Sequence, residues 1–174
     1  MSRIDIKNPY LDMQYTYDLA DLRSVGTTYE KDAEKASIYK FVYDNREKFQ
    51  YFLYMLNTSL LQFYKQDEYR VTFIVVPDEN LPDEIKEMIT NMDKNEILDL
   101  IKYNTIPKSL DLRYIQSTNI NYVPTAYLNQ TVFFSNNNGN VMLNNKAVIM
   151  DQVKLPYSTV LVADRLSFPP LLGI

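Results

Sequence analysis

The chain has 174 residues, a formal net charge of −4 and 46% hydrophobic residues. That length and apolar fraction fit one domain with its own core. It contains no histidine and no cysteine, which excludes Ser-His-Asp and Cys-His catalysis, disulfides and the common zinc sites. Nucleic acid is not an expected partner either, because phosphate binding needs a basic face and the sequence has no basic run.

Residues 1–36 show little periodicity and are predicted to form an N-terminal extension. Asn8-Pro9 indicates a turn or extended backbone, and a short helix is expected over residues 18–23. Two interpretations stay open, a flexible tail and an arm that docks on a neighbouring protein. Tyrosine gives a large contact area at low rotamer cost, which suits an interface. The candidate anchors of a docking arm are Tyr10, Tyr15 and Tyr17.

Helical spacing dominates the first half of the remaining chain. Apolar residues recur at intervals of three and four over residues 30–65, which predicts two helices. Residues 70–76 form a β-branched run ended by Pro77 and predict a buried strand. Pro82 suits the first position of a helix, and the pair Asp93 and Glu96 predicts a capping box for a helix that reaches about Lys102.

The pattern changes to short strands from about Tyr122 onward. Asn138-Gly139 is a strong hairpin signal between two of these strands. Helices first and an antiparallel set later predict an α+β fold rather than alternating β-α-β units. The predicted strands cover residues 123–128, 131–135, 141–143, 146–153 and 159–163.

Acidic residues gather between Asp78 and Asp99, and we expect them on solvated helix faces. They show neither the carboxylate pair of a glycosidase nor the alternating ligands and bend glycine of a calcium loop. No cofactor or metal is therefore expected. The glycosylation sequons Asn57-Thr58-Ser59 and Asn129-Gln130-Thr131 are expected to be silent chance matches in a chain with 16 asparagines.

Three strings, taken in order, resemble the fasciclin domain family over about residues 37–170. Residues 72–80 (Thr-Phe-Ile-Val-Val-Pro-Asp-Glu-Asn) resemble the first fasciclin box, residues 103–107 resemble the Tyr-His segment, and residues 158–170, with their terminal Pro-Pro, resemble the second box. The resemblance implies a helical N-terminal half packed on antiparallel or mixed β-sheets formed mainly by the C-terminal half. The expected organisation is an extension at 1–36, a domain at 37–170 and a tail at 171–174.

The chain departs from the family at its usual histidines. Asn104 stands at the first such position, and Leu161 or Val162 lies near the second. The family's Tyr-His region is associated with adhesion and integrin contact, so the resemblance implies partner binding at Tyr103 and Asn104, which the missing histidine weakens. Asp164, between apolar neighbours at a strand end, is expected to accept backbone hydrogen bonds.

These observations favour a non-enzymatic structural or protein–protein interaction role. Residue usage typical of AT-rich genomes, the absent cysteines and an N-terminus without an apolar leader favour a minor component of a large assembly, such as a viral capsid. Its partners would then be capsid proteins, and its place the virion or cytoplasm. No stretch approaches 18 uncharged apolar residues, so no transmembrane segment is expected.

Two alternatives stay open. The first is an extracellular fasciclin-type adhesion module whose upstream signal has been removed, with glycans on Asn57 or Asn129. The second is an enzyme that works with carboxylates or lysine alone, which would need a pocket holding at least two acidic groups with displaced pKa values.

Overall fold

The structure is a computed structural model that describes residues 37–59, 62–66, 69–117 and 122–170. The predictions for the N-terminal extension, including Tyr10, Tyr15 and Tyr17, and for the tail at 171–174 lie outside the described residues.

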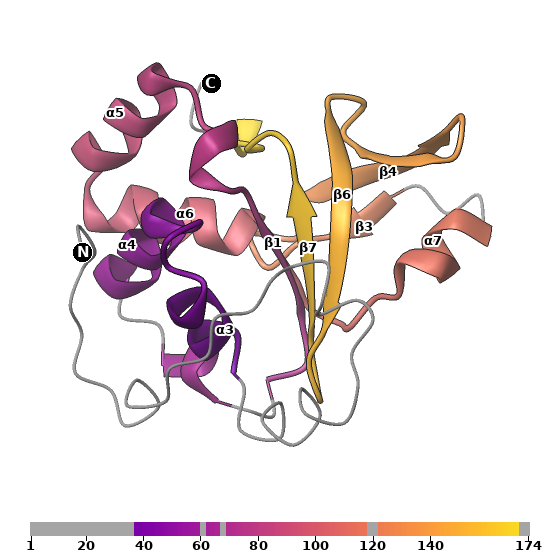
Figure 1. The fold of residues 1–174 in the computed structure, drawn as a ribbon, viewed down its shortest axis with the longest axis horizontal. Helices are drawn as coiled ribbons and strands as arrows, with labels where there is room; N and C mark the ends of the chain where they lie inside the picture. The colour runs from indigo at the N-terminus through magenta and orange to yellow at the C-terminus, as the bar shows by residue number, and fades with distance from the viewer. Residues whose placement is uncertain (1–36, 60–61, 67–68, 118–121, 171–174) are drawn as a thin grey trace.

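Helices occupy most of the first half of the described chain, and strands occupy the second half (Figure 1). This order confirms the predicted α+β class. The α-helices are α3 (Ile38–Asp44), α4 (Gln50–Ser59), α5 (Asp83–Asn91), α6 (Lys94–Tyr103) and α7 (Leu112–Ser117), with short 3-10 turns η2 (Gln62–Lys65) and η3 (Asp78–Asn80). The strands are β1 (Thr72–Val75), β2 (Thr105–Ile106), β3 (Tyr122–Pro124), β4 (Thr131–Asn137), β5 (Asn140–Leu143), β6 (Ala147–Lys154) and β7 (Thr159–Ala163).

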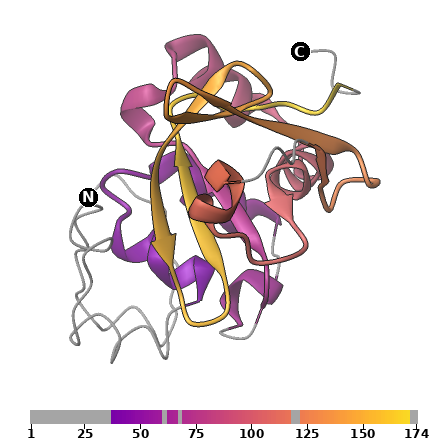
Figure 2. The same cartoon turned by 90° about the vertical axis from the view of Figure 1, so that its right-hand side faces the viewer.

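The described strands form one mixed sheet of seven in the order β2-β1-β7-β6-β5-β4-β3. Strands β1 and β7 run parallel, with Phe73 opposite Val160, and every other pair is antiparallel. The parallel pair places the string that resembles the first fasciclin box beside the one that resembles the second. Figure 2 shows β6 and β7 running side by side, as their register requires.

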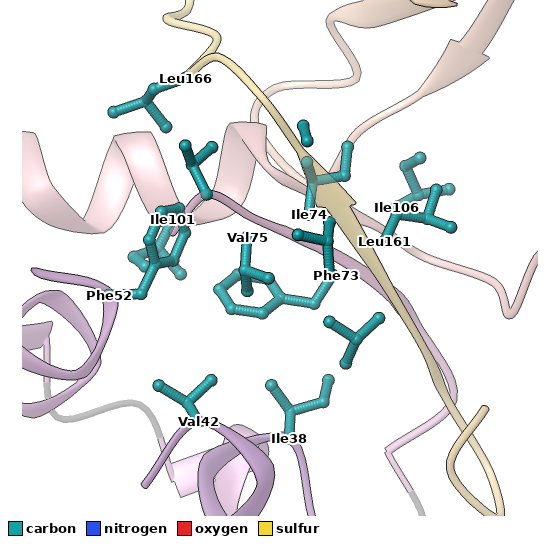
Figure 3. Packing of buried hydrophobic residues seen from close by; sticks show 14 of the residues in the cluster. Ile38, Val42, Phe52, Phe73, Ile74, Val75, Ile101, Ile106, Leu161 and Leu166 are labelled. Carbon is teal, nitrogen blue, oxygen red and sulfur yellow. The ribbon is translucent and has the colours of Figure 1, made fainter. Parts of the chain in front are cut away.

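The core lies where β1 meets the helices. Figure 3 shows Phe73 facing Ile38 and Val42, while Ile74, next along the strand, lies nearer Ile106 and Leu161. All six side chains are buried. Burying one such side chain contributes roughly 1.5–3 kcal/mol, so this contact between helices and strand is a main source of stability. The period-2 alternation of β1 lets it serve both faces of the sheet.

Local capping agrees with the sequence at one helix and differs from it at another. The Asp93 carboxylate accepts the Glu96 N–H at 2.8 Å and the Glu96 carboxylate accepts the Asp93 N–H at 3.0 Å, which confirms the capping box of α6. Pro82 was predicted to be the first residue of a helix. In the structure it is the N-cap of α5, which begins one residue later.

Asp78 corrects the prediction of a uniformly solvated acidic face. It is half-buried, and its carboxylate accepts the N–H groups of Gln50 and Tyr51 at the start of α4. The acidic side chains that are exposed, as predicted, are Glu79, Asp83, Glu84, Glu87, Asp93 and Glu96.

Two turns shape the second half of the sheet. Asn138 and Gly139, with φ of +52° and +87°, join β4 to β5 and confirm the predicted hairpin. The predicted strand over 123–128 is too long, because β3 ends at Pro124. The hydroxyl of Thr125 donates to the carbonyl of Gln130 at 2.7 Å and accepts the N–H of Tyr127 at 3.2 Å, so it bends the chain into a turn.

Candidate interaction surface

The two described residues predicted to bind a partner are buried. Tyr103 is 4% exposed and Asn104 is 1% exposed. The side-chain amide of Asn104 donates to the carbonyls of Leu100 and Ser167 at 3.0 and 3.1 Å, and the Tyr103 hydroxyl accepts from the Asn144 amide at 3.3 Å. These bonds tie the end of α6 to the second box and to the β5–β6 turn. Partner binding at these positions stays a prediction.

Asp164 has the structural role expected from its sequence position. Its carboxylate accepts the N–H of Val148 at 2.8 Å, and its own N–H donates to the Val148 carbonyl at 3.0 Å. The carboxylate therefore extends the β6–β7 pairing beyond the last residue of β7.

The carboxyl groups of Asp78 and Asp111 each have a shifted pKa, and each has a structural partner. Burial raises the pKa of Asp78, against the opposing hydrogen bonds from Gln50 and Tyr51. A hydrogen bond from Lys154, with a nitrogen–oxygen distance of 2.7 Å, lowers the pKa of Asp111. The first carboxyl caps a helix and the second pairs with a strand. Among the described residues, no group of three or more acidic side chains is placed to hold a metal ion.

No helix in the described ranges combines the length and apolar character needed to cross a membrane.

The second half of the sheet has almost no charge. Residues 122–150, which we call the uncharged meander, carry a single charged side chain, Lys146. They span β3, β4, β5 and the first half of β6. Residues 78–102, by contrast, carry eight acidic and three basic side chains. Figure 1 shows α5 and α6 on one side of the molecule and β3 and β4 on the other, so these acidic helices lie away from β3 and β4.

Large exposed apolar side chains concentrate in this uncharged meander. Among the described residues there are four, and three of them are Tyr122 and Leu128, each 70% exposed, and Met150, 44% exposed. The fourth is Phe63. Protein interfaces lose charged residues and gain tyrosine and methionine at their centres. The composition and exposure of the meander therefore fit an interaction surface.

Tyr122 is held in place by its cross-strand neighbour. It lies opposite Phe133, and the two rings have centroids 5.0 Å apart at 52°. The adjacent pair, Val123 and Val132, is buried, so the strand alternation turns the aromatic pair toward the outer face. The Phe133 backbone in turn exchanges hydrogen bonds with Asn144, donating to its side-chain oxygen and accepting its N–H. The backbone that carries Phe133 is therefore fixed by hydrogen bonds to the β5–β6 turn.

Leu128 occupies a backbone conformation that leucine rarely adopts. Its φ is +51°, and Asn129, which follows, has a φ of +57°. The N–H of Gln130 closes this turn on the carbonyl of Tyr127 at 2.9 Å. Leu128 is therefore exposed and also has an unfavourable backbone conformation. A residue held in a rarely populated backbone conformation points to a functional constraint. The place of Leu128 in this turn was not predicted, because residues 123–128 matched a β-rich strand.

The order of strands, with helices packed against one part of a mixed sheet, defines a fasciclin-like α+β fold. A similar solved structure is a FAS1 domain pair from the insect cell adhesion molecule fasciclin I, with 18% sequence identity and a TM-score of 0.51. The match covers 66% of this chain and 43% of that chain. It confirms the resemblance predicted from the sequence at the level of the fold. Neither a family model nor a curated protein sequence matches the chain.

Proposed function

We propose that this chain is a non-enzymatic protein-binding module that contacts its partner through the uncharged meander. The observation that carries the proposal is the coincidence of three large exposed apolar side chains with a segment that has one charge in 29 residues (122–150). Exposed apolar surface with few charges is a mark of interaction sites on folded domains. The similar fold in a cell adhesion molecule supports the same role.

Tyr122 is the residue expected to contribute most to binding. Interface tyrosines are frequent hot spots, and truncating one costs about 2 kcal/mol or more. Its contact with Phe133 already restricts the ring, so less rotamer entropy is lost on binding. Pro124 on the same strand has no N–H to donate, which disfavours addition of a partner strand to β3. The contact is therefore made by side chains.

We propose residues 1–36 as a second contact, with Tyr10, Tyr15 and Tyr17 as anchors. Support comes from the sequence, since a 36-residue segment can reach roughly 120 Å when extended. The boundary at residue 37 is supported by Ser37, whose hydroxyl caps α3 by accepting the Lys40 N–H at 3.0 Å.

Two settings for this role are compatible with the sequence. A place in a large assembly such as a viral capsid rests on the sequence alone, and absence of the chain from purified particles by mass spectrometry would contradict it. An extracellular adhesion role has one additional support, the fold shared with a domain pair of an adhesion molecule.

The binding surface is tested by site-specific photo-crosslinking in the native source. A crosslinker at Tyr122 should capture a discrete partner, whereas the same group at Glu87, an exposed position on α5, should not. With that partner purified, Tyr122→Ser should weaken binding at least about tenfold, or 1.4 kcal/mol, while Glu87→Gln leaves it unchanged. Loss of binding on Glu87→Gln with none on Tyr122→Ser would refute the proposed surface. Deletion of residues 1–36 measures the arm separately.

A further inference from the structure

The two glycosylation sequons lie in opposite environments. Asn57 is inside α4 and 9% exposed, and its side-chain oxygen accepts the Tyr39 hydroxyl at 2.9 Å. Its side-chain nitrogen, the atom that would carry a glycan, is buried. Ser59, the third residue of this sequon, is also buried and donates to the Leu56 carbonyl. A glycan at Asn57 is incompatible with the packing of α3 on α4.

The second sequon is open to solvent. Asn129 is exposed in the turn between β3 and β4, and Thr131, whose hydroxyl completes the sequon, is exposed at the first residue of β4. The left-handed backbone of Asn129 belongs to a tight turn, where asparagine is well tolerated. Its side chain therefore has room for a bulky substituent, as an N-linked glycan requires of a surface loop.

We infer that Asn129 is an N-glycan attachment site and that Asn57 is not, when the chain passes through a secretory pathway. The donor is an oligosaccharide on a lipid pyrophosphate. The Asn129 side-chain nitrogen forms a bond to the anomeric carbon, the bond from that carbon to the pyrophosphate oxygen breaks, and the amide gives up one proton as the lipid pyrophosphate leaves. This assignment does not rest on the proposed binding role.

A glycan at this site would change the surface beside it. Asn129 follows Leu128 directly, so a sugar chain there covers the apolar tip of the turn and leaves Tyr122, on β3, as the main exposed apolar group. A secreted form and an unglycosylated form thus present different surfaces to a partner.

The full chain expressed behind a secretion leader tests the site. Intact mass should show one N-glycan per chain, and enzymatic release should leave an aspartate at position 129 by peptide mapping. Thr131→Val, which removes the sequon and keeps a β-branched residue, should abolish the glycan. Ser59→Ala, the matched change in the other sequon, should leave it unchanged. An unmodified secreted chain, or a folded chain with its glycan at Asn57, would overturn the inference. Unglycosylated protein from bacteria tests partner binding independently.

Discussion

Asp78 accepts the backbone N–H of Gln50 at 2.9 Å, joining the loop after β1 to the first turn of α4. Its second carboxylate oxygen accepts the N–H of Tyr51 at 3.1 Å, and its own N–H donates to the Lys48 carbonyl at 2.7 Å. A residue 28 positions away thus satisfies the free donors at the start of the helix. These three hydrogen bonds connect the loop after β1 to the start of α4.

Removing this cap should destabilise the fold. Asp78→Ala is expected to lower the free energy of unfolding by about 1–2 kcal/mol, because two N–H groups of α4 lose their acceptor. Urea denaturation followed by circular dichroism measures the change. Glu79→Ala is the matched control, since Glu79 is exposed and next in sequence, and it should change stability by less than about 0.5 kcal/mol.

The same residue should make stability depend on pH. Burial raises the pKa of Asp78, so the folded state keeps this proton to a higher pH than the unfolded state does. The part of its contribution that depends on this proton is complete below the unfolded pKa of about 3.9 and declines as pH rises through the folded pKa. Asp78→Asn does not titrate. The stability of wild type relative to this variant should fall as pH rises from about 4, and a constant difference would contradict the shift.

Asp111 should act in the opposite direction. The hydrogen bond from Lys154 and the nearby Arg113 hold the pKa of Asp111 below its ordinary value. Its contribution is therefore present above the unfolded pKa of about 3.9 and is lost as pH falls through the folded pKa. Lys154→Met should raise the Asp111 pKa in an NMR titration and cost less than about 1 kcal/mol, because the pair is partly solvated.

Salt provides a check on this pair, since screening weakens exposed charges. High salt should shrink the effect of Lys154→Met. Lys48→Met, a change at another exposed lysine, should leave the Asp111 titration unchanged.

Leu128 should show a conflict between stability and binding. Leu128→Asn should stabilise the fold by about 1 kcal/mol, because asparagine adopts the left-handed conformation more readily than leucine. The same change should weaken partner binding. Leu128→Ala separates the two effects, because it removes the apolar contact while keeping a Cβ in the strained backbone. It should weaken binding without a gain in stability by thermal denaturation, and stabilisation equal to that of Leu128→Asn would contradict the strain.

The ion pair of α3 is fully buried. Lys40 and Asp44, one helical turn apart, have a nitrogen–oxygen distance of 2.6 Å and side chains with no exposed surface. Lys40→Met alone should cost about 3–5 kcal/mol, because it leaves the Asp44 charge in the core without this partner. The double variant Lys40→Met with Asp44→Leu should recover much of that loss. Denaturant titration of the four members of the cycle gives the coupling energy.

Local patterns in the sequence were sufficient where neighbours in the chain decide the structure. The capping box at Asp93 and the Asn138-Gly139 hairpin depend on residues within a few positions, and both are found. The strand β7 was predicted from its continuous β-rich run, and all five of its residues are buried. The two-residue strand β2 and the short helix α7 were not predicted, since β2 exists only through its pairing with the distant β1.

The sequence by itself determined the α+β class, the fasciclin-like order of elements and the presence of only one charged side chain in residues 122–150. Those properties follow from periodicity and composition, which can be read along the chain without knowing its three-dimensional contacts. Tertiary structure decided which residues of that segment reach solvent. The register of β3 on β4 turns Tyr122 and Phe133 outward, while Phe134, one position later, is buried. It also decided that Asn57 is enclosed and Asn129 open, because exposure depends on what packs against a residue from elsewhere in the chain.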